Sequence, residues 1–447
     1  MTTIPRFTQS SCRMFVVLRT SDEDSPIVLQ SLGYEFSESF ATSPKSIHIL
    51  KLASEESAEK LIHDPKLKKL GISANLLVGL NGIKLKDAND FLKSLSSEKT
   101  LSDNDLMDIL VELICLEAPE KEVVAEEELK MIRDEISKII ENSVCTIFGS
   151  YPYQVRRNGF SDIDLAVSTK PTESTEIRPF QTVIDNTQCL FNKPMNHTEF
   201  YTYPGAEVIK AIYNCFLKNE EFCKRFQMRA HLVETPIVML KSTKNPGLDM
   251  SYDISVNNQI SIDKAQLLND FIVADKSVGN EMRNVMMFVV HWAKSNRLLG
   301  GAYPDEKLVI KYKFNSYIIN HLIIHFVQIA ARTCIVNTLE KPDNRVSNYN
   351  FDELFPSYTD FLEQFFEYYL TFDYEKMGIF GTELIEKKIL AESKNVNVSP
   401  FMMVDSLHTT HNFTANVTPD GVLFFKSLLK SSLEKMKNSN FRIFDLL

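Results

Sequence analysis

Short runs of alternating apolar and polar residues mark the first part of the chain, residues 12–82, and predict a small module of strands and helices. Period-two runs rich in β-branched and aromatic residues are typical of strands, whereas apolar residues at spacings of three and four indicate helices. The expected order is strand, helix, strand, strand, helix, strand, with strands at 14–19, 34–40, 46–53 and 72–78 and helices at 25–32 and 54–64. This order is that of ferredoxin-like sheets, which include RNA-recognition domains.

The central strands of this module carry few aromatic side chains. Domains that stack RNA bases on such a sheet need aromatic residues there. The strand at 46–53 has none, and the strand at 14–19 offers only Phe15. We therefore expect the module to serve in dimerisation or docking, including a homodimer of this chain, in place of RNA reading.

After the module, the pattern changes twice. Residues 83–103 combine Asn, Asp, Ser and Lys without periodicity and are expected to be a linker. Residues 104–255 mix helical and strand patterns and are expected to form a catalytic domain, whereas 256–447 are mostly helical. An acidic run at 117–141 has a stripe of leucine and isoleucine at helical spacing, so we expect a helix whose acidic face is solvated. The predicted fold class is α+β.

The composition indicates a globular protein but does not by itself indicate an activity. With 44% hydrophobic and 24% charged residues, the chain has the composition of a globular protein. No run of 18 apolar residues occurs, so no membrane span is expected. The seven scattered cysteines argue against a zinc module and favour a reducing compartment. We expect the cytoplasm, with the mitochondrion as the alternative because the first 20 residues contain arginines but no acid. The net charge of −10 leaves open a local basic patch for nucleic acid.

The residues that point to chemistry follow an apolar strand at 145–148. Gly149 and Ser150 end the strand, and after eleven intervening residues come Asp162 and Asp164, followed by apolar residues. In a strand, residues two apart face the same side, so the two carboxylates point together. Paired carboxylates are ligands for hard divalent cations. Gly149 lets a phosphate approach the backbone closely, and Ser150 offers it a hydroxyl and an amide.

A third carboxylate is expected from a neighbouring strand. Asp253 lies between large apolar residues in the strand at 252–256, as an inward-facing ligand would. Three carboxylates holding two Mg²⁺ or Mn²⁺ ions suit nucleotidyl transfer, in which the metals activate a hydroxyl and clamp a triphosphate. The pattern therefore predicts a two-metal site formed by Asp162, Asp164 and Asp253.

Together, four motifs resemble a known family. The motifs are G-S-x11-D-I-D-L, D-I-S-V-N-N, H-W-A-K and N-S-Y, and their order resembles the noncanonical poly(A)/poly(U) polymerases. The resemblance covers residues 104–435, and the N-terminal module and the segment 365–373 are similar to the mitochondrial poly(A) polymerase branch. It implies a template-independent enzyme that adds nucleotides to an RNA 3′ end, with a DNA polymerase β-like palm and a helical domain that binds the base.

The resemblance also implies individual roles. Asp162, Asp164 and Asp253 correspond to the metal ligands, and Gly149 with Ser150 to the phosphate-contacting turn. The remaining nucleotide contacts are Asn258 for ribose and base, Lys294 for the triphosphate, Ser316 for a phosphate and Tyr317 for stacking on the base. Two positions depart from the pattern. Val290 replaces a second triphosphate lysine and Ala265 a ribose-contacting threonine, so we expect weaker nucleotide binding or a substitute cation from His291 or an arginine.

The choice of nucleotide depends on residues 405–412. Relatives that prefer UTP carry D-P-F-E-x-x-H-N there, and their histidine contacts uracil; this chain has D-S-L-H-T-T-H-N, with Asp405 first and His411 at the discriminating position. A site built around a hydrogen bond discriminates well, because the wrong base leaves a polar group unpaired. We therefore expect UTP, with ATP and poly(A) synthesis as the alternative. An inactive homologue that binds RNA or acts as a scaffold is the second alternative, and the RNA 3′ end is the expected partner.

Overall fold

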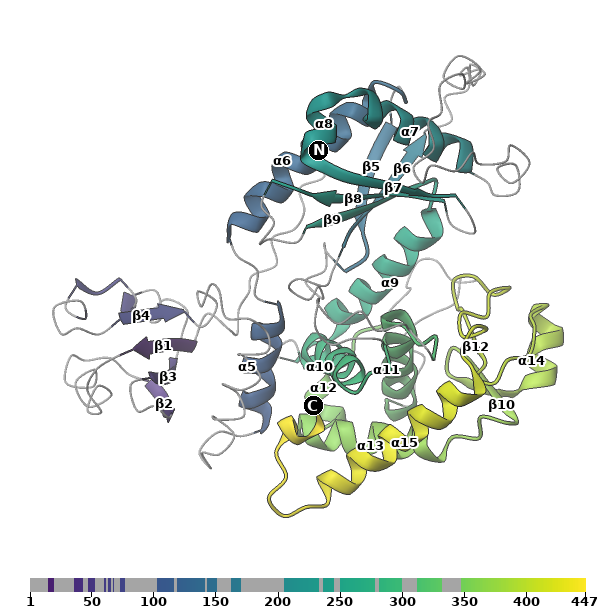
Figure 1. Cartoon of the computed structure of the whole chain (residues 1–447). Helices are drawn as coiled ribbons and strands as arrows, with labels where there is room; N and C mark the ends of the chain where they lie inside the picture. The colour runs from purple at the N-terminus through teal and green to yellow at the C-terminus, as the bar shows by residue number, and fades with distance from the viewer. Residues whose placement is uncertain are drawn as a thin grey trace. The chain divides into compact units, whose positions relative to one another are not determined.

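A computed structural model shows two compact units, Met1–Leu116 with Leu267–Leu447 and Glu117–Gln266 (Figure 1). The structure describes residues 15–19, 36–42, 47–52, 60–61, 63–65, 67, 73–76, 103–115, 119–140, 143–150, 162–169, 205–232, 236–244, 250–277, 281–299, 312–331 and 347–447. The division at 266/267 falls inside helix α9 (Gln259–Ala274).

The unit Glu117–Gln266 is built on a five-stranded sheet in the order β5-β6-β9-β8-β7. Its strands are β5 (Ser143–Phe148), β6 (Ile163–Thr169), β7 (Phe226–His231), β8 (Ile237–Ser242) and β9 (Ser251–Val256). The two central strands, β6 and β9, are parallel, and every other pair is antiparallel. The strands expected around 145–148 and 252–256 are therefore present as β5 and β9, on either side of β6.

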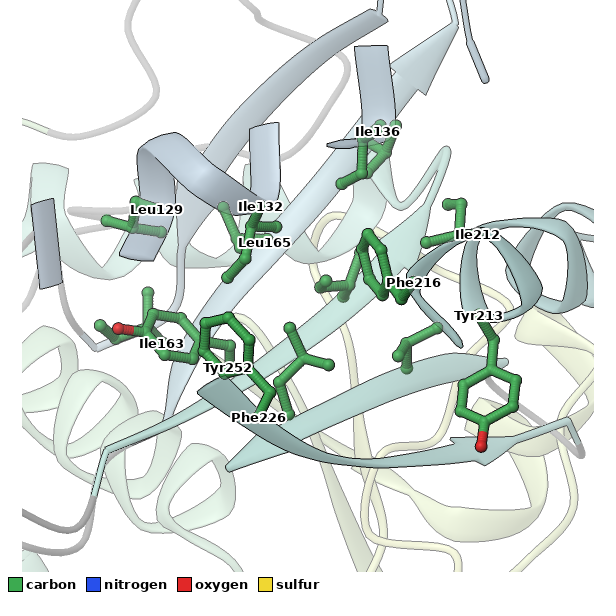
Figure 2. Packing of buried hydrophobic residues seen from close by; sticks show 14 of the residues in the cluster. Leu129, Ile132, Ile136, Ile163, Leu165, Ile212, Tyr213, Phe216, Phe226 and Tyr252 are labelled. Atoms are coloured by element: carbon green, nitrogen blue, oxygen red, sulfur yellow. The ribbon is translucent and has the colours of Figure 1, made fainter. Parts of the chain in front are cut away.

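One face of this sheet is covered by helices. Helix α6 (Pro119–Ser137) begins with proline, whose fixed φ suits the first turn. Its stripe, Leu129, Ile132 and Ile136, is buried against Leu165 of β6, as Figure 2 shows. Helices α7 (Ala206–Lys218) and α8 (Glu220–Arg225) complete the core with phenylalanines. Burying one such aliphatic side chain contributes about 1.5–3 kcal/mol, so the stripe is the main reason that α6 stays on the sheet.

The acidic face of α6 differs from the expectation. Several of its glutamates are exposed, as expected for a solvated face, but Glu128 is 0% and Glu135 6% exposed. Each is buried with hydrogen-bond donors: Arg225, Ser242 and Tyr252 for Glu128, and Lys138 and Asn219 for Glu135. A run of acids along a helix does not reveal which members face polar partners in the core, and this is why the pattern misplaced these two.

The N-terminal strands form a separate four-stranded sheet in the order β2-β3-β1-β4. The strands are β1 (Phe15–Arg19), β2 (Phe36–Thr42), β3 (Ile47–Leu52) and β4 (Ser73–Leu76), and all pairings are antiparallel. The helix expected at 25–32, the linker at 83–102 and most of the helix at 54–64 lie outside the described residues. The ferredoxin-like assignment of the module therefore stays a prediction.

The rest of the first unit is largely helical. Its longer helices are α5 (Asp103–Cys115), α10 (Glu281–Ser295), α11 (Ser316–Ala330), α13 (Tyr358–Thr371) and α15 (Pro419–Met436). Helix α5 packs on α10 and α13, and Asn284 of α10 donates to Asp108 of α5. Trp292 is fully buried, and its ring centroid lies 4.9 Å from that of Phe366 in the core of this unit.

Smaller elements complete this unit. Strands β10 (Met377–Phe380), β11 (Glu383–Glu386) and β12 (Met403–Val404) form a sheet in the order β11-β10-β12, next to helix α14 (Lys387–Lys394). The short helix α12 (Phe351–Leu354) and a 3₁₀ turn at Ile443–Leu446 are packed on the larger helices. None of the helices in the described ranges is long and apolar enough to cross a membrane.

Candidate active site

The three aspartates come from the two parallel strands at the centre of the sheet. In the β6–β9 register, Asp164 lies directly opposite Asp253, and Asp162 immediately precedes β6. Ile163, Leu165, Tyr252 and Ile254 face the helix-covered core. The strand alternation therefore directs Asp162, Asp164 and Asp253 to the opposite face. Because neighbouring strands are about 4.8 Å apart, the backbone brings the three carboxylates together, as the sequence pattern requires.

Gly149 is required by this arrangement. It follows β5, whose last residue, Phe148, pairs with Asp164. Its φ of +75° lies in the left-handed region, and a Cβ at this position would overlap the Oδ2 atom of Asp164. Only glycine avoids both costs. The next residue, Ser150, is half-buried. Residues 151–161, which include Arg156 and Arg157, lie outside the described residues.

The carboxylates repel one another. Burial, followed by the charges of Asp253 and Asp162, raises the pKa of Asp164 to about 7. Burial and the charge of Asp162 raise the pKa of Asp253 to about 6. A bound divalent cation would reverse this electrostatic cost, because it favours the charged form of each carboxyl group. The charge distribution therefore fits a cation site.

The ligand set itself is not closed in this structure. Among the described residues, no three His, Cys, Asp or Glu side chains are arranged to hold a metal ion. Asp162 is hydrogen-bonded to the hydroxyl of Ser251, at the start of β9. The donor chemistry, hard carboxylate oxygens on adjacent strands, nevertheless fits Mg²⁺ or Mn²⁺.

Asn258 has a structural role in addition to the expected nucleotide contact. Its side chain accepts a hydrogen bond from Ser261 N (3.3 Å) and donates to Ser255 Oγ (3.3 Å), at the start of α9. Ala265 of α9 is 6% exposed and packs against Phe148 and Ala166. These contacts account for a small residue at position 265, because a larger one would push α9 from the strands.

Helix α10 carries the expected triphosphate contact. Lys294 lies in its last turn and is half-buried, whereas Val290 is buried with the other apolar residues of the helix. His291 is 0% exposed. The expectation that His291 might replace the missing lysine is therefore wrong, since a fully buried imidazole is not accessible to a triphosphate.

Helix α11 begins with the two residues expected to contact the nucleotide. Asn315 caps it by accepting a hydrogen bond from Ile318 N (2.9 Å), and this leaves Ser316 exposed at the N-terminus of a 15-residue helix. Free N–H groups and the helix dipole favour phosphate at such an end. The ring of Tyr317 contacts those of His321 (4.0 Å between centroids) and Phe413 (5.2 Å). Its hydroxyl donates to Asp405 Oδ2 (3.2 Å).

Asp405 links Tyr317 to the residues that follow β12. Its carboxylate is fully buried; Oδ1 accepts hydrogen bonds from Leu407 N (2.9 Å) and His408 N (3.3 Å), and Oδ2 lies 3.9 Å from His411 Nδ1. The side chain of His411 is 44% exposed, and its ring is stacked on that of His408, with 5.5 Å between centroids. Burial and the charge of Asp405 raise the pKa of Tyr317, so its hydroxyl stays a donor. The structure thus brings Tyr317, Asp405 and His411 together.

A buried polar network, which the sequence pattern did not reveal, anchors the segment 399–414. The amine of Lys387 donates to the carbonyls of Ser399 (2.6 Å) and Pro400 (2.8 Å). Asn412 donates to Ser399 Oγ (2.9 Å), and Thr414 Oγ1 accepts from Met403 N (2.8 Å). All of these residues except Pro400 are buried. The network fixes both ends of the segment that carries Asp405 and His411.

The two histidines at helical spacing in α11 serve packing. His325 makes hydrogen bonds to the Gly381 carbonyl (2.8 Å) and the Tyr368 hydroxyl (2.9 Å), and burial lowers its pKa to about 4. His321 contacts the carbonyl of Tyr317 (3.0 Å). Both line a pocket together with Gln328, Met403 and Phe413. These contacts give both residues a structural role.

Comparison of the sequence with known proteins shows which proteins this chain resembles. Residues 106–272 match the family model of the central palm domain of mitochondrial-like poly(A) RNA polymerase. The chain is 40% identical, over 458 residues, to a U6 snRNA-specific terminal uridylyltransferase of Caenorhabditis elegans; the match covers 96% of this chain and 69% of the relative.

Solved structures show the same fold. A crystal structure of mtPAP in complex with ATPγS aligns with a TM-score of 0.58 at 14% identity, covering 98% of this chain and 97% of that one. A cytoplasmic RNA terminal U-transferase aligns with a TM-score of 0.56 at 15% identity, covering 77% of this chain and 96% of that one. The sequence match to the uridylyltransferase and the palm-domain match together show that the chain belongs to the noncanonical poly(A)/poly(U) polymerase family of RNA nucleotidyltransferases.

Proposed function

We propose that this protein is a template-independent RNA uridylyltransferase that adds UMP units from UTP to an RNA 3′ end. The observation that carries the choice of UTP is the grouping of His411 with Asp405 and Tyr317. The buried carboxylate of Asp405 interacts with both other side chains and so restrains the position of the histidine. The 40% identical relative, a terminal uridylyltransferase, supports the same choice.

The base would stack on Tyr317 and make a hydrogen bond with His411. Stacking on one aromatic ring is worth about 1–3 kcal/mol and does not distinguish bases. Selectivity therefore has to come from the edge of the base. Because Nδ1 of His411 lies on the side of Asp405, the other ring nitrogen would face the base, and a base that cannot pair with it leaves that polar group unsatisfied. Adenine, being larger, would also have to displace the imidazole.

We further propose that Asp162, Asp164 and Asp253 hold two Mg²⁺ or Mn²⁺ ions. When bound, such ions lower the pKa of the RNA 3′-hydroxyl and neutralise the charge of the triphosphate. To bind the ions, the three side chains have to be ionised and to face the same side of the sheet. The β6–β9 register provides the common orientation. Gly149 keeps space free beside Asp164, where a side chain would displace the carboxylate.

The remaining nucleotide contacts follow from the resemblance of the motifs to the family. Ser150 and Ser316 would bind phosphates, Lys294 would contact the triphosphate, and Asn258 would contact ribose and base. Ser316 has the helix N-terminus that suits a phosphate. Lys294 is the cation retained where Val290 replaces the second lysine, so we expect a raised KM for UTP relative to enzymes with both.

The proposal includes the wider organisation of the chain. We propose a ferredoxin-like module at 12–82, a linker at 83–103, a catalytic domain at 104–255 and a base-binding domain at 256–447. The antiparallel sheet β2-β3-β1-β4 supports the first of these, and a homodimer through this module is its proposed role. Because the relative acts on U6 snRNA, we propose a small nuclear RNA as the substrate and the nucleus, in place of the cytoplasm, as its location.

The deciding experiment is primer extension with purified protein and each NTP separately. A U6 snRNA primer and an unrelated RNA primer are each incubated with Mg²⁺ or Mn²⁺. We expect extension with UTP to exceed that with ATP, and His411→Leu to lower this preference at least about tenfold, the value of one lost hydrogen bond of about 1.4 kcal/mol. A preference for ATP that His411→Leu leaves unchanged contradicts the proposed uracil site.

Two alternatives are separated by the same assay. Poly(A) synthesis is favoured by the likeness in fold to mtPAP, and it predicts long products with ATP alone. An inactive, RNA-binding homologue predicts no extension with any NTP and no effect of Asp162→Ala on RNA binding. The retention of all three aspartates, on adjacent strands with repelling charges, argues for activity, since such a group is costly without a cation.

A further inference from the structure

Glu128 on α6 has an environment that the proposed reaction does not explain. Its side chain is fully buried and accepts three hydrogen bonds, from Ser242 Oγ (2.7 Å), the Tyr252 hydroxyl (2.8 Å) and Arg225 Nε. These donors belong to β8, β9 and α8. A buried carboxylate is stable only when its oxygens are satisfied in this way, so all four side chains hold one another in a defined geometry.

The network reaches the strand that carries Asp253. Tyr252 immediately precedes Asp253, and its ring points into the core on the opposite side of β9. Ser242 is the last residue of β8, and its amide donates to Met250 O (2.8 Å), just before β9. Ser251, between these two anchors, is hydrogen-bonded to Asp162. Glu128 therefore holds the start of β9 from the helix-covered face of the sheet. The hydrogen bond between Ser251 and Asp162 connects the same part of β9 to the metal-site aspartates.

The charge of Glu128 is paired with that of Arg225, so an uncharged residue could not replace the glutamate without loss. Arg225 balances Glu128 and also lies 3.6 Å from the exposed Glu127, which is itself paired with Lys244. An apolar residue at position 128 would fill the space but leave the guanidinium of Arg225 and the hydroxyls of Ser242 and Tyr252 without this acceptor. Directional bonds of this kind fix the position of a backbone segment, which a merely apolar contact does less well.

We propose that Glu128 is a positioning residue for the metal site, and that it acts through Tyr252 and Ser242 to hold Asp253 opposite Asp164. This inference rests on the proposed metal-binding role of Asp253. The residue touches neither nucleotide nor metal. Its effect is on the spacing of the two carboxylate-bearing strands, because the hydrogen bonds from Tyr252 and Ser242 determine where β9 begins beside β6.

The test compares Glu128→Gln and Tyr252→Phe with a matched control, Glu135→Gln. Glu135 is a second buried glutamate of the same helix, and it is bonded to Asn219 and Lys138 instead of to the sheet strands β8 and β9. For each variant, thermal melting measures stability, primer extension at varied Mn²⁺ gives the half-maximal metal concentration, and electron paramagnetic resonance of free Mn²⁺ measures binding without catalysis.

We expect Glu128→Gln to raise the Mn²⁺ concentration at half-maximal activity, and the Mn²⁺ dissociation constant, by about three- to tenfold, less than the 10–100-fold typical of residues in direct contact with metal ligands. Tyr252→Phe should act in the same direction, and the double variant should be less than additive because both changes break one network. At saturating Mn²⁺, KM for UTP should stay within about twofold of the wild type. Glu135→Gln should shift melting but not metal dependence.

Two results would overturn the inference. One is unchanged Mn²⁺ binding in Glu128→Gln and Tyr252→Phe despite lowered melting temperatures, which would limit Glu128 to a role in folding. The other is the same change in metal dependence in Glu135→Gln, which would make it a general effect of instability. Failure of the proposed function is recognised separately, since a wild type that binds Mn²⁺ yet extends no primer leaves the binding comparison intact.

Discussion

Replacing Asp164 with asparagine should stabilise the metal-free protein at neutral pH while abolishing nucleotide transfer. An ordinary aspartate has a pKa of 3.8, whereas burial and the neighbouring carboxylates raise the pKa of Asp164 to about 7. Each tenfold change in proton affinity corresponds to about 1.4 kcal/mol, so forcing Asp164 to ionise at pH 8 costs about 4 kcal/mol at most. Solvent screening reduces this to about 2 kcal/mol, because the carboxyl is partly open to water.

The pH dependence has a definite sign. Below the unfolded-state pKa of 3.8, Asp164 is protonated in both the folded and the unfolded state, and it costs nothing. Between that value and about 7, the folded state holds the proton more tightly, so the free energy of unfolding falls as the pH rises. Asp253, whose pKa is raised to about 6, adds to the same trend over a narrower window. The asparagine variant lacks the larger part of this dependence.

The measurement is thermal unfolding in EDTA between pH 4 and pH 8. For a unit of the 150 residues Glu117–Gln266, about 2 kcal/mol corresponds to a rise of about 4–8 °C in the melting temperature of Asp164→Asn at pH 8. The difference from wild type should shrink towards pH 4, and Mg²⁺ should stabilise only the wild type. A variant that is no more stable than wild type at pH 8, or whose advantage does not change with pH, would refute the reasoning.

Two further substitutions test other parts of the site. Gly149→Ala places a Cβ against Asp164 Oδ2 at a φ of +75°, so we expect at least about 1–2 kcal/mol of destabilisation and loss of most primer extension, measured by urea unfolding and initial rates. Normal activity of this variant would contradict the close approach of Asp164. Tyr317→Phe keeps the stacking ring but removes one donor to the buried Asp405, so we expect about 1–3 kcal/mol of lost stability with KM for UTP changed less than about threefold. If KM rises tenfold or more without a change in melting, the hydroxyl contacts substrate instead.

The sequence predicted the orientation of the three aspartates best, because side chains alternate between the two faces of a strand. Asp162 and Asp164 bracket an apolar Ile163, and Asp253 lies between Tyr252 and Ile254, so the side of the sheet that each residue faces follows from alternation alone. The adjacency of β6 and β9 does not follow from it. These strands are about 90 residues apart in the chain, and only the resemblance to a family predicted that they pair.

Other features depend on contacts that no local pattern contains. The acidic run at 117–141 does not show that Glu128 meets Arg225, because the donors come from α8, β8 and β9. Helix α5 has an apolar face suited to either unit, and its packing on α10 is set by pairs such as Asn284 with Asp108. Lys387 would be expected at the surface, and it is buried because two carbonyl groups satisfy its amine.

The anchoring of residues 399–414 has a consequence for how nucleotide preference changes. Lys387, Asn412 and Thr414 secure the two ends of this segment through hydrogen bonds to residues other than His408 and His411. Residues 408–411 are half-buried or exposed, and their backbone bonds, such as Asp405 N to the His411 carbonyl (3.0 Å) and His411 N to the His408 carbonyl (2.8 Å), do not depend on the side chains at these positions. Evolution, or an engineer, is therefore free to vary these four positions and retune which nucleotide is incorporated without rebuilding the scaffold beneath them.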